Sequence, residues 1–401
     1  MKKVKYQKEN LSDVVWFQEG PGVRNTQYTI SGVKLLNVTN LVNGKVDITN
    51  TDRYISNEEA YGKYKHFLVD EGDLIIASSG IKVEYFDKKM GFIEKKDLPL
   101  CMNTSTIRFK TLDERKLNIR YFMYFLQSAD FKKQLSQQIT GSAQLNFGPS
   151  HLKKMYVKMT DIDNQIDIVK TLDKVSGLIE KRKAQLEKLV LLIKSRFIEM
   201  FGDPVSNPLG WEKKTLKEVC VKLNDGTHFS PESFEVGEYK YVTAKNIKMS
   251  GFDFSNITYV PEEVHRPIYE RCNPELGDVL YIKDGVTTGI AMVNTLEEEF
   301  TLLSSVALLK QDRRIMNGHF LTALLNNESM YTDIRSNMGG AAITRLTIAK
   351  LNAIKVILPS IELQEQFAYF VEQVDKSKFE IQKSLEKLEI LKKSLMQQYF
   401  G

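Results

Sequence analysis

Cysteine is scarce in this chain, and the cysteines present lie far apart. Cys101, Cys220 and Cys272 are an odd number and include no C-x-x-C pair, so neither a disulfide framework nor a zinc knuckle is expected. The five histidines are scattered along the sequence. We therefore expect no metal site, and a reducing cytoplasm suits such a chain.

Long apolar runs are also lacking. The most apolar stretch, from Leu302 to Leu309, is interrupted by two serines, whereas a membrane helix needs about 20 apolar residues. The first residues, MKKVKYQKENL, have no apolar core of signal-peptide length. We expect neither membrane contact nor export.

Motifs of the common enzyme classes are absent as well. The chain has no G-x-x-x-x-G-K-[ST] phosphate loop, no G-x-G-x-x-G turn, no H-E-x-x-H helix and no G-x-S-x-G elbow. Amino-methyltransferases carry Asp or Asn before Pro-Pro and an aromatic residue, an arrangement that NPLGW and NPELG both lack. We expect no catalytic residue in this chain.

What the chain does contain is an internal repeat. Residues 151–202, laid on residues 350–401 at an offset of 199 without gaps, are identical at 14 of 52 positions. A weaker similarity lies upstream, where GDLII from Gly72 matches GDVLY from Gly277. The chain is a tandem duplication in which each half has a variable front and a better matched rear.

Each rear segment carries apolar residues at spacings of three and four, interrupted by Arg182 in the first copy and by Lys378 and Lys392 in the second. This is the pattern of a coiled-coil seam. A helix of about 40 residues would be about 60 Å long, and a stripe this narrow needs a partner helix. We expect the two helices to pair as an antiparallel coiled coil; the alternative is two core helices in separate domains. The seam residues are Leu172, Val175, Ile179, Leu186, Leu189 and Ile193 in the first copy and Val371, Val374, Ile381, Leu385, Leu388 and Leu395 in the second.

The segment GDPVSNPLGW separates the two halves. Gly202 can end the first helix, and Pro204 and Pro208 prevent its continuation. The expected division is two globular fronts and two spacer helices, with bounds 1–158, 159–202, 203–358 and 359–401.

The fronts mix short β-like segments with helical ones. Strands are expected at 73–78, 105–110 and 154–159 in the first front and at 278–283, 304–310 and 352–358 in the second. One helix is expected in each front, over 119–135 and over 318–334. The fold class is therefore α+β, with two globular domains in a pseudo-twofold tandem repeat joined by the long helices.

Charge differs between the fronts. Residues 1–160 contain 25 Lys and Arg against 17 Asp and Glu, a balance of +8, whereas residues 203–360 contain 17 against 20, a balance of −3. A basic domain is compatible with a polyanion such as DNA. Solvated lysine faces are common, so the charge alone does not select this ligand.

The duplicated segments together carry a family resemblance. The stretches are MFGDPVSNPLGW between the halves, GDLIIASSG and GDVLYIKDG in the fronts, and GSAQLNFGPSHLKKMYVKM and GGAAITRLTIAKLNAIKVILP before the long helices. In this order, and twice over, they resemble the specificity subunit of a type I restriction-modification system.

That resemblance implies a DNA-binding subunit without catalytic activity. Each front would be a target recognition domain for one half of a bipartite double-stranded DNA site, and the paired helices would set the gap between the halves. Two DNA methyltransferase subunits would dock around the helices, and separate restriction and translocase subunits would join them. This chain would bind no cofactor, since S-adenosylmethionine, ATP and Mg would belong to the partners.

Polar residues near the expected strand ends are candidates for contacts to bases or phosphates. The second copy has Gly340-Ala-Ala-Ile where the first has Gly141-Ser-Ala-Gln, so no shared role is expected there. Gly72-Asp73 and Gly277-Asp278 are interpreted as turns that precede a strand. The candidates are Lys34, Asn37, Asn40, Ser78, Ser79, Lys82 and Gln144 in the first front, and Lys240, Lys245, Asn246, Lys283, Thr344 and Arg345 in the second.

Two other classes of function remain open. A non-catalytic protein-interaction scaffold would use the same two globular heads on a coiled coil but would have no salt-dependent affinity for DNA. An enzyme with an active site between the halves would need clustered titratable groups, and the sequence gives no sign of them.

Overall fold

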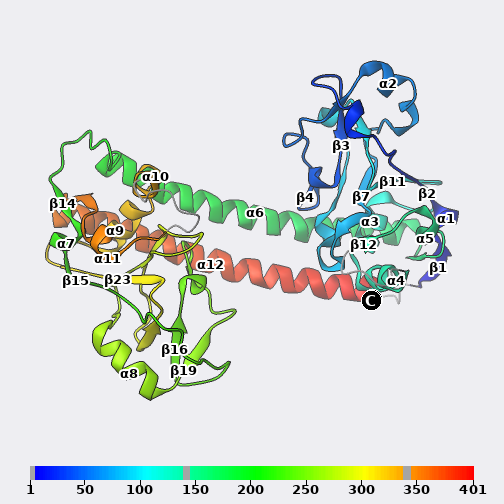
Figure 1. Ribbon diagram of the computed structural model, residues 1–401. Coiled ribbons are helices and arrows are strands. Elements are labelled where there is room, and N and C mark those ends of the chain that lie inside the picture. Colours follow the sequence, from blue (N-terminus) through cyan, green and yellow to red (C-terminus); the bar gives the residue numbers. More distant parts are fainter. Residues whose placement is uncertain (1–4, 139–144, 337–344) are drawn as a thin grey trace. The chain divides into compact units, whose positions relative to one another are not determined.

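The computed structural model describes residues 5–138, 145–336 and 345–401, which fold into two compact units (Figure 1). Unit 1 consists of Met1–Lys181 together with Leu385–Gly401, and unit 2 is the continuous segment Arg182–Ser384. The two long helices, α6 (Ile162–Phe201) and α12 (Ile361–Phe400), each contribute one part to unit 1 and the other part to unit 2. The division therefore runs through both helices and not at their ends.

The centre of unit 1 is a four-stranded antiparallel sheet on which helices pack. The Phe122 ring on the first helix of the front lies 5.2 Å from the Phe109 ring on the sheet. In order across the sheet, the strands are β2 (Val15–Glu19), β11 (Thr106–Thr111), β7 (Leu74–Ala77) and β9 (Met90–Phe92). The helices are α3 (Ile119–Gln127) and α4 (Ala129–Gln138).

A second, smaller sheet of unit 1 has its own apolar cluster, which includes Val33 and Cys101. One of its two pairings, β10 with β3, is parallel. Its strands, in order, are β10 (Leu100–Met102), β3 (Val33–Leu36) and β6 (Tyr54–Ile55). The remaining elements are β1 (Gln7–Asn10) with β13 (Tyr156–Met159), β4 (Leu41–Val42) with β5 (Lys45–Val46), β8 (Ser79–Ile81) with β12 (Leu145–Asn146), and the short helices α1 (Leu11–Val14), α2 (Asn57–Tyr61) and α5 (Pro149–Leu152).

Unit 2 repeats the two main sheets of this architecture in the same order. Its four-stranded sheet has the order β15 (Cys220–Asp225), β23 (Val306–Gln311), β20 (Val279–Ile282) and β21 (Ala291–Val293). Its three-stranded sheet has the order β19 (Thr258–Val260), β16 (Tyr239–Val242) and β22 (Phe300–Leu302), again with one parallel pairing. The other elements are β14 (Lys213–Thr215) with β24 (Lys355–Ile357), β17 (Ile247–Lys248) with β18 (Gly251–Phe252), and the helices α7 (Leu216–Val219), α8 (Glu262–Arg271), α9 (Gly318–Leu325), α10 (Glu328–Ser336) and α11 (Ile348–Asn352).

All six expected strands are confirmed, as β7, β11, β13, β20, β23 and β24. The expectation of one helix per front was wrong, because each is divided in two. Ser128 has an extended backbone between α3 and α4, and its hydroxyl accepts a hydrogen bond from the amide of Phe131 at 3.2 Å. In unit 2, the side chain of Asn327 caps the start of α10 in the same way, accepting from the amide of Ser329 at 3.0 Å.

Each unit is closed by the last turn of one long helix. In unit 1, Phe400 at the end of α12 is fully buried, with its ring 5.1 Å from the ring of Tyr121. In unit 2, Phe201 at the end of α6 is equally buried and lies 4.7 Å from Phe320. Within each unit, the end of one long helix therefore packs into the same domain core from which the other long helix starts, so the two helices run in opposite directions.

The start of each long helix is held by a buried glutamine. Gln165 accepts a hydrogen bond from the amide of Asn118 at 2.9 Å and donates to two backbone carbonyls, those of Lys116 and Thr160. Gln364 makes the equivalent three hydrogen bonds in unit 2, to the amide of Asn317 and the carbonyls of Ile315 and Pro359. Both side chains are fully buried. The repeat therefore preserves the joint between front and helix down to individual hydrogen bonds.

The predicted seam residues all lie on the less exposed side of these helices. Leu172, Val175, Ile179, Val371, Val374 and Leu385 are buried, and Leu186, Leu189, Ile193, Ile381, Leu388 and Leu395 are half-buried. No helix in the described part of the chain is both long and apolar enough to cross a membrane.

Candidate nucleic-acid interface

Three of the predicted contact residues of unit 1 lie around one loop and the hairpin that follows it. Lys34 lies on β3, and Asn37 and Asn40 bracket the short 3-10 helix η2 (Val38–Asn40), which leads into the hairpin β4–β5. The Nζ of Lys34 donates to the carbonyl oxygen of Ile48 at 2.9 Å. These residues thus position the hairpin.

Asn40 is buried, and its side chain braces this loop. Its Oδ1 accepts from the amide of Asn37 at 2.8 Å, and its Nδ2 donates to the carbonyl of Asp47 at 3.0 Å. In unit 2, Asn246 is likewise buried and makes the corresponding bonds to the amide of Thr243 and the carbonyl of Asp253. The two asparagines are equivalent turn residues, and in this conformation neither presents its amide to a ligand.

Two further candidates are also withdrawn from the surface. The Nζ of Lys283 lies 3.3 Å from Asp225 and 3.1 Å from Asp284, with a side chain only 2% exposed. Ser78 is 1% exposed. In this conformation a phosphate could reach Lys283 only by displacing two carboxylates, and burial closes off Ser78. Direct contact by these two residues stays a prediction.

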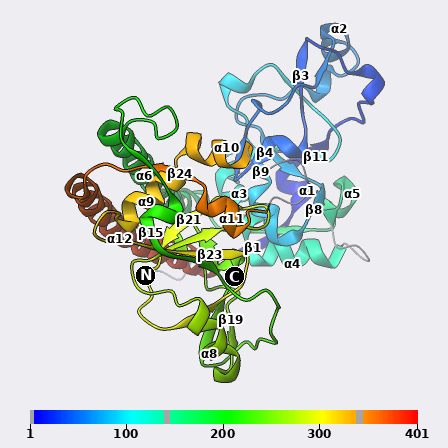
Figure 2. The same ribbon diagram turned by 60° about the vertical axis from the view of Figure 1, so that its left-hand side comes forward.

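Lys82 opens instead onto a pocket of about 340 Å³ beside the hairpin. The pocket lies between the β4–β5 turn and the connection from β7 to β9, which contains the 3-10 helix η4 (Val83–Lys88). Figure 2 shows β4 and β9 as neighbours in this unit. The lining residues are Val42, Asn43, Gly80, Ile81, Lys82, Tyr85, Lys88 and Lys89. Three lysines among the lining residues make this pocket a candidate site for an anion. Lys88 and Lys89 were missed because the sequence did not show which lysines line the same pocket.

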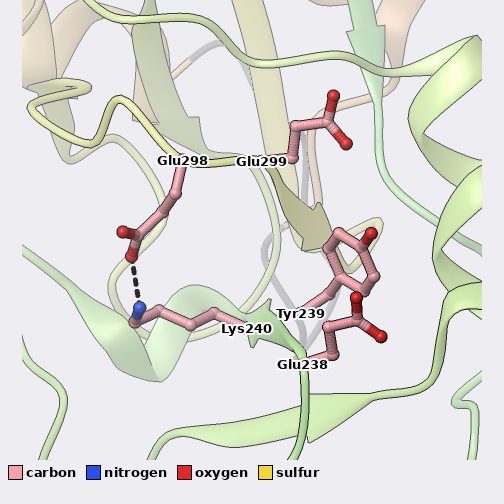
Figure 3. Close-up of a pocket in the computed structure, with 5 residues that line it drawn as sticks. All are labelled: Glu238, Tyr239, Lys240, Glu298 and Glu299. Carbon is pink, nitrogen blue, oxygen red and sulfur yellow. Dashed lines mark hydrogen bonds and ion pairs between the residues drawn. The ribbon is translucent and has the colours of Figure 1, made fainter.

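The remaining candidates of unit 2 have a different environment. Lys240 lines a pocket with Glu238, Glu298, Glu299 and Tyr239, and it forms an ion pair with Glu298 (Figure 3). This pocket has more carboxylates than ammonium groups and would repel a phosphate. The positive charge of Lys240 is therefore compensated by the carboxylate of Glu298.

A buried histidine, His265, contacts two residues that line this acidic pocket, Tyr239 and Glu299. The ring of His265 stacks on Tyr239 with centroids 3.8 Å apart, and its Nδ1 and Nε2 lie 2.9 Å from Thr301 Oγ1 and 3.2 Å from Glu299 Oε2. Burial holds the pKa of His265 below its ordinary value, although Glu299 opposes that shift. The imidazole is thus neutral near pH 7 and adds no positive charge to the pocket.

The other candidates occupy varied positions. Lys245 is exposed on η6 (Ala244–Asn246), Arg345 is exposed and lies 3.4 Å from Asp284, and Asn37 and Ser79 are half-buried. Gln144 and Thr344 lie outside the described residues.

The turns that precede β7 and β20 are structural, as interpreted from the sequence. Gly72 and Gly277 both have φ of 86°, a conformation that favours glycine. Asp73 and Asp278 are buried; the former contacts Arg108 at 3.2 Å and Lys110 at 3.3 Å, and the latter contacts Lys310 at 3.4 Å. Within the described residues, no group of three His, Cys, Asp or Glu is placed to hold a metal ion.

The model of the type I restriction modification DNA specificity domain matches this chain twice, over residues 23–188 and 208–392. These two matches cover most of the sequence and coincide with its two structural repeats. The chain belongs to this family.

Known relatives agree with that membership. The specificity subunit of the type I restriction enzyme MjaVIII, from Methanocaldococcus jannaschii, is 27% identical over 185 residues, which is 44% of this chain and 42% of that protein. The matched stretch thus spans less than half of the relative's length.

Two solved structures share the fold of this family member over its whole length. The S subunit of a type I restriction-modification system from M. genitalium has a TM-score of 0.60 at 17% identity, and the alignment covers 100% of this chain and 97% of that one. A structure described as the basis of complex assembly and conformational transition of the type I R-M system has a TM-score of 0.55 at 16% identity, with 100% and 99% covered.

Proposed function

We propose that this chain is the sequence-specific DNA-recognition subunit of a type I restriction-modification complex, and that each unit reads one half of a bipartite site in double-stranded DNA. The observation that carries this proposal is the coincidence of two DNA specificity domains in the sequence with two units of the same architecture. Two similar readers in one chain suit a target with two separate halves.

The long helices would act as the spacer. Each begins at a buried glutamine of one unit and ends at a buried phenylalanine of the other. Helices of 40 residues anchored at both ends are stiff elements compared with a loop, so they would define the gap between the half-sites.

The helices also carry a duplicated apolar patch, which we assign to partner subunits. Leu191 and Leu192 on α6 are 59% and 47% exposed, and the equivalent Ile390 and Leu391 on α12 are 69% and 45% exposed. Large apolar side chains exposed at repeated positions are typical of an interface. Two copies of the patch would receive two DNA methyltransferase subunits.

The chemistry of the complex would belong to those partners. The methyltransferase subunits would bind S-adenosylmethionine and modify an adenine turned out of the duplex, and restriction and translocase subunits would supply ATP- and Mg-dependent cleavage. This chain would be non-catalytic and cytoplasmic, and it would direct the other subunits to their target.

The test is to co-express the chain with the methyltransferase subunit encoded beside it and to map methylated adenines across the genome. The expected result is one two-part motif with a constant gap. Changing Leu186 and Leu385 to Glu should abolish or blur the motif, since both lie in the seam. Lys188→Glu with Lys387→Glu is the matched control, because it adds the same residue at exposed positions of the same helices.

The alternative, a protein-interaction scaffold, predicts a different outcome. A stable complex would form with the methyltransferase subunit, yet no adenine would be modified in any sequence context. That result would refute DNA recognition by this chain.

A further inference from the structure

We infer that the two units contribute unequally to DNA binding: the lysine pocket of unit 1 binds phosphates of the DNA backbone, and the described part of unit 2 has no counterpart of it. This inference rests on the proposed function. It assigns the salt-dependent part of the affinity chiefly to the first unit.

The pocket of unit 1 has the charge that a phosphate requires. Lys82, Lys88 and Lys89 all line it. The carboxylate of Asp87, on the same connection, lies 3.1 Å from Lys132 of α4 and is therefore already neutralised. Among the described residues, the one carboxylate paired with these lysines is Glu84, at 3.7 Å from Lys82 in a pair whose side chains are both about 60% exposed. An exposed pair of this kind is weak, and a phosphate can replace it. The Nζ of Lys89 also donates to the carbonyl of Val38 at 3.4 Å.

The pocket also has a defined floor and wall. Ile81 is buried and Val42 is partly exposed beside it, so the lysines stand around an apolar base. The amide of Gly44 in the hairpin turn donates to the carbonyl of Lys88 at 3.1 Å, which joins the hairpin to η4. The Nζ of Lys88 lies 5.6 Å from the centre of the half-exposed Tyr85 ring. The lysines are thus held on connected backbone around one cavity.

Unit 2 lacks the segment that builds this pocket. Between the paired residues Ile76 and Met90 of unit 1 there are 13 residues, 77–89, whereas only nine, 282–290, separate the equivalent pair Tyr281 and Ala291. The connection of unit 2 is thus four residues shorter, and it contains no counterpart of the 3-10 helix η4. The single lysine left in the shorter connection, Lys283, is buried between two aspartates.

Two further lysines of unit 2 are paired as well, whereas Lys245 on η6 is exposed. Lys248 on the hairpin β17–β18 lies 3.9 Å from Asp253, and Lys240 is paired with Glu298. The tip of the short connection presents Val286, which is 92% exposed. Unit 2 therefore has an apolar and mostly neutral surface where unit 1 has lysines. This agrees with the net charges of the two fronts, which are −3 for residues 203–360 and +8 for residues 1–160.

The test measures how DNA affinity depends on salt, using the complex with the methyltransferase subunit and a duplex that contains the mapped motif. Each phosphate contact adds about 0.9 to the slope of log K against log salt. The variant Lys82→Gln, Lys88→Gln, Lys89→Gln should lower that slope by about 2 to 3. Affinity for unrelated duplexes should fall in parallel, because backbone contacts carry no sequence information.

Two controls separate the pocket from total charge. Lys133→Gln, Lys153→Gln, Lys154→Gln removes three exposed charges from unit 1 outside the pocket, and it should change the slope by less than one. Replacing the three pocket lysines by Arg should restore the wild-type slope, which a folding defect would not do.

The unit 2 triple Lys240→Gln, Lys245→Gln, Lys248→Gln tests the asymmetry directly. It should lower the slope by less than the pocket variant does. A pocket variant with the wild-type slope, or a unit 2 triple with an equal effect, would overturn the inference. If the wild-type complex binds no duplex in a salt-dependent manner, the proposed function itself fails.

Discussion

Gln364→Leu should destabilise unit 2 far more than its position at the start of a long helix suggests. The side chain is fully buried and makes three hydrogen bonds to backbone groups, at 2.9 Å to the amide of Asn317, 3.0 Å to the carbonyl of Ile315 and 2.9 Å to that of Pro359. Leucine has a similar volume, so it fills the site without a cavity, but it leaves all three backbone groups without this partner.

The expected cost follows from those three groups. A buried donor or acceptor left unsatisfied costs about 1–3 kcal/mol, and part of this is recovered through apolar burial and relaxation. We expect a loss of about 3 kcal/mol in the free energy of unfolding of unit 2, which corresponds to a factor of about 100 in its equilibrium constant.

Hydrogen exchange followed by mass spectrometry is the suitable assay, because the chain has two units and global unfolding need not be two-state. Amides of β20, β23 and α9 should exchange faster in Gln364→Leu, while those of β7 and β11 should not. Gln366→Leu, two residues further along the same helix and exposed, is the matched control and should change little. Equal exchange rates in the two variants would refute the assignment of an anchoring role to Gln364.

Three further predictions concern single groups. Burial raises the pKa of the Cys101 and Cys272 thiols to about 12, so a thiol reagent at pH 8 should label them only after unfolding, and rapid labelling of the native protein would contradict this. The hydrogen bonds from Arg314 lower the pKa of Asp312 to about 2; its stabilising effect should be present above about pH 4 and lost as the pH falls toward 2, and an NMR titration should show this carboxyl returning toward its ordinary pKa in Arg314→Ala. Phe400→Ala should cost unit 1 about 3–5 kcal/mol, seen as faster exchange in α3, and an effect confined to unit 2 would disprove the packing described.

The repeat, the long helices and the strand cores could be predicted because they depend on local patterns. Short, continuous apolar runs that follow Gly-Asp mark β7 and β20, and heptad spacing marks α6 and α12. The break at Ser128 could not be predicted in this way, since apolar periodicity continues across it and only the cap formed with Phe131 reveals it.

The candidate site was harder to predict because charge in a sequence does not show which charges are free. Lys82 and Lys283 both lie in the connection that follows the equivalent strands β7 and β20, yet the first is exposed and the second is enclosed by Asp225, a residue distant in the chain. The pairing of Asp87 with Lys132, which keeps the Asp87 carboxylate from neutralising the pocket lysines, likewise depends on tertiary contacts.

The discontinuous make-up of unit 1 has a consequence for how the protein forms on the ribosome. Unit 2 is a single stretch, Arg182–Ser384, and can fold as soon as that stretch has emerged. Unit 1 is synthesised first but needs Leu385–Gly401, including the buried Phe400, to complete its core. At about 5–20 residues per second, the apolar core of unit 1 stays exposed for on the order of ten seconds or more before Leu385–Gly401 is synthesised. The unit that is made first is therefore completed last, and it would be the natural client of a chaperone.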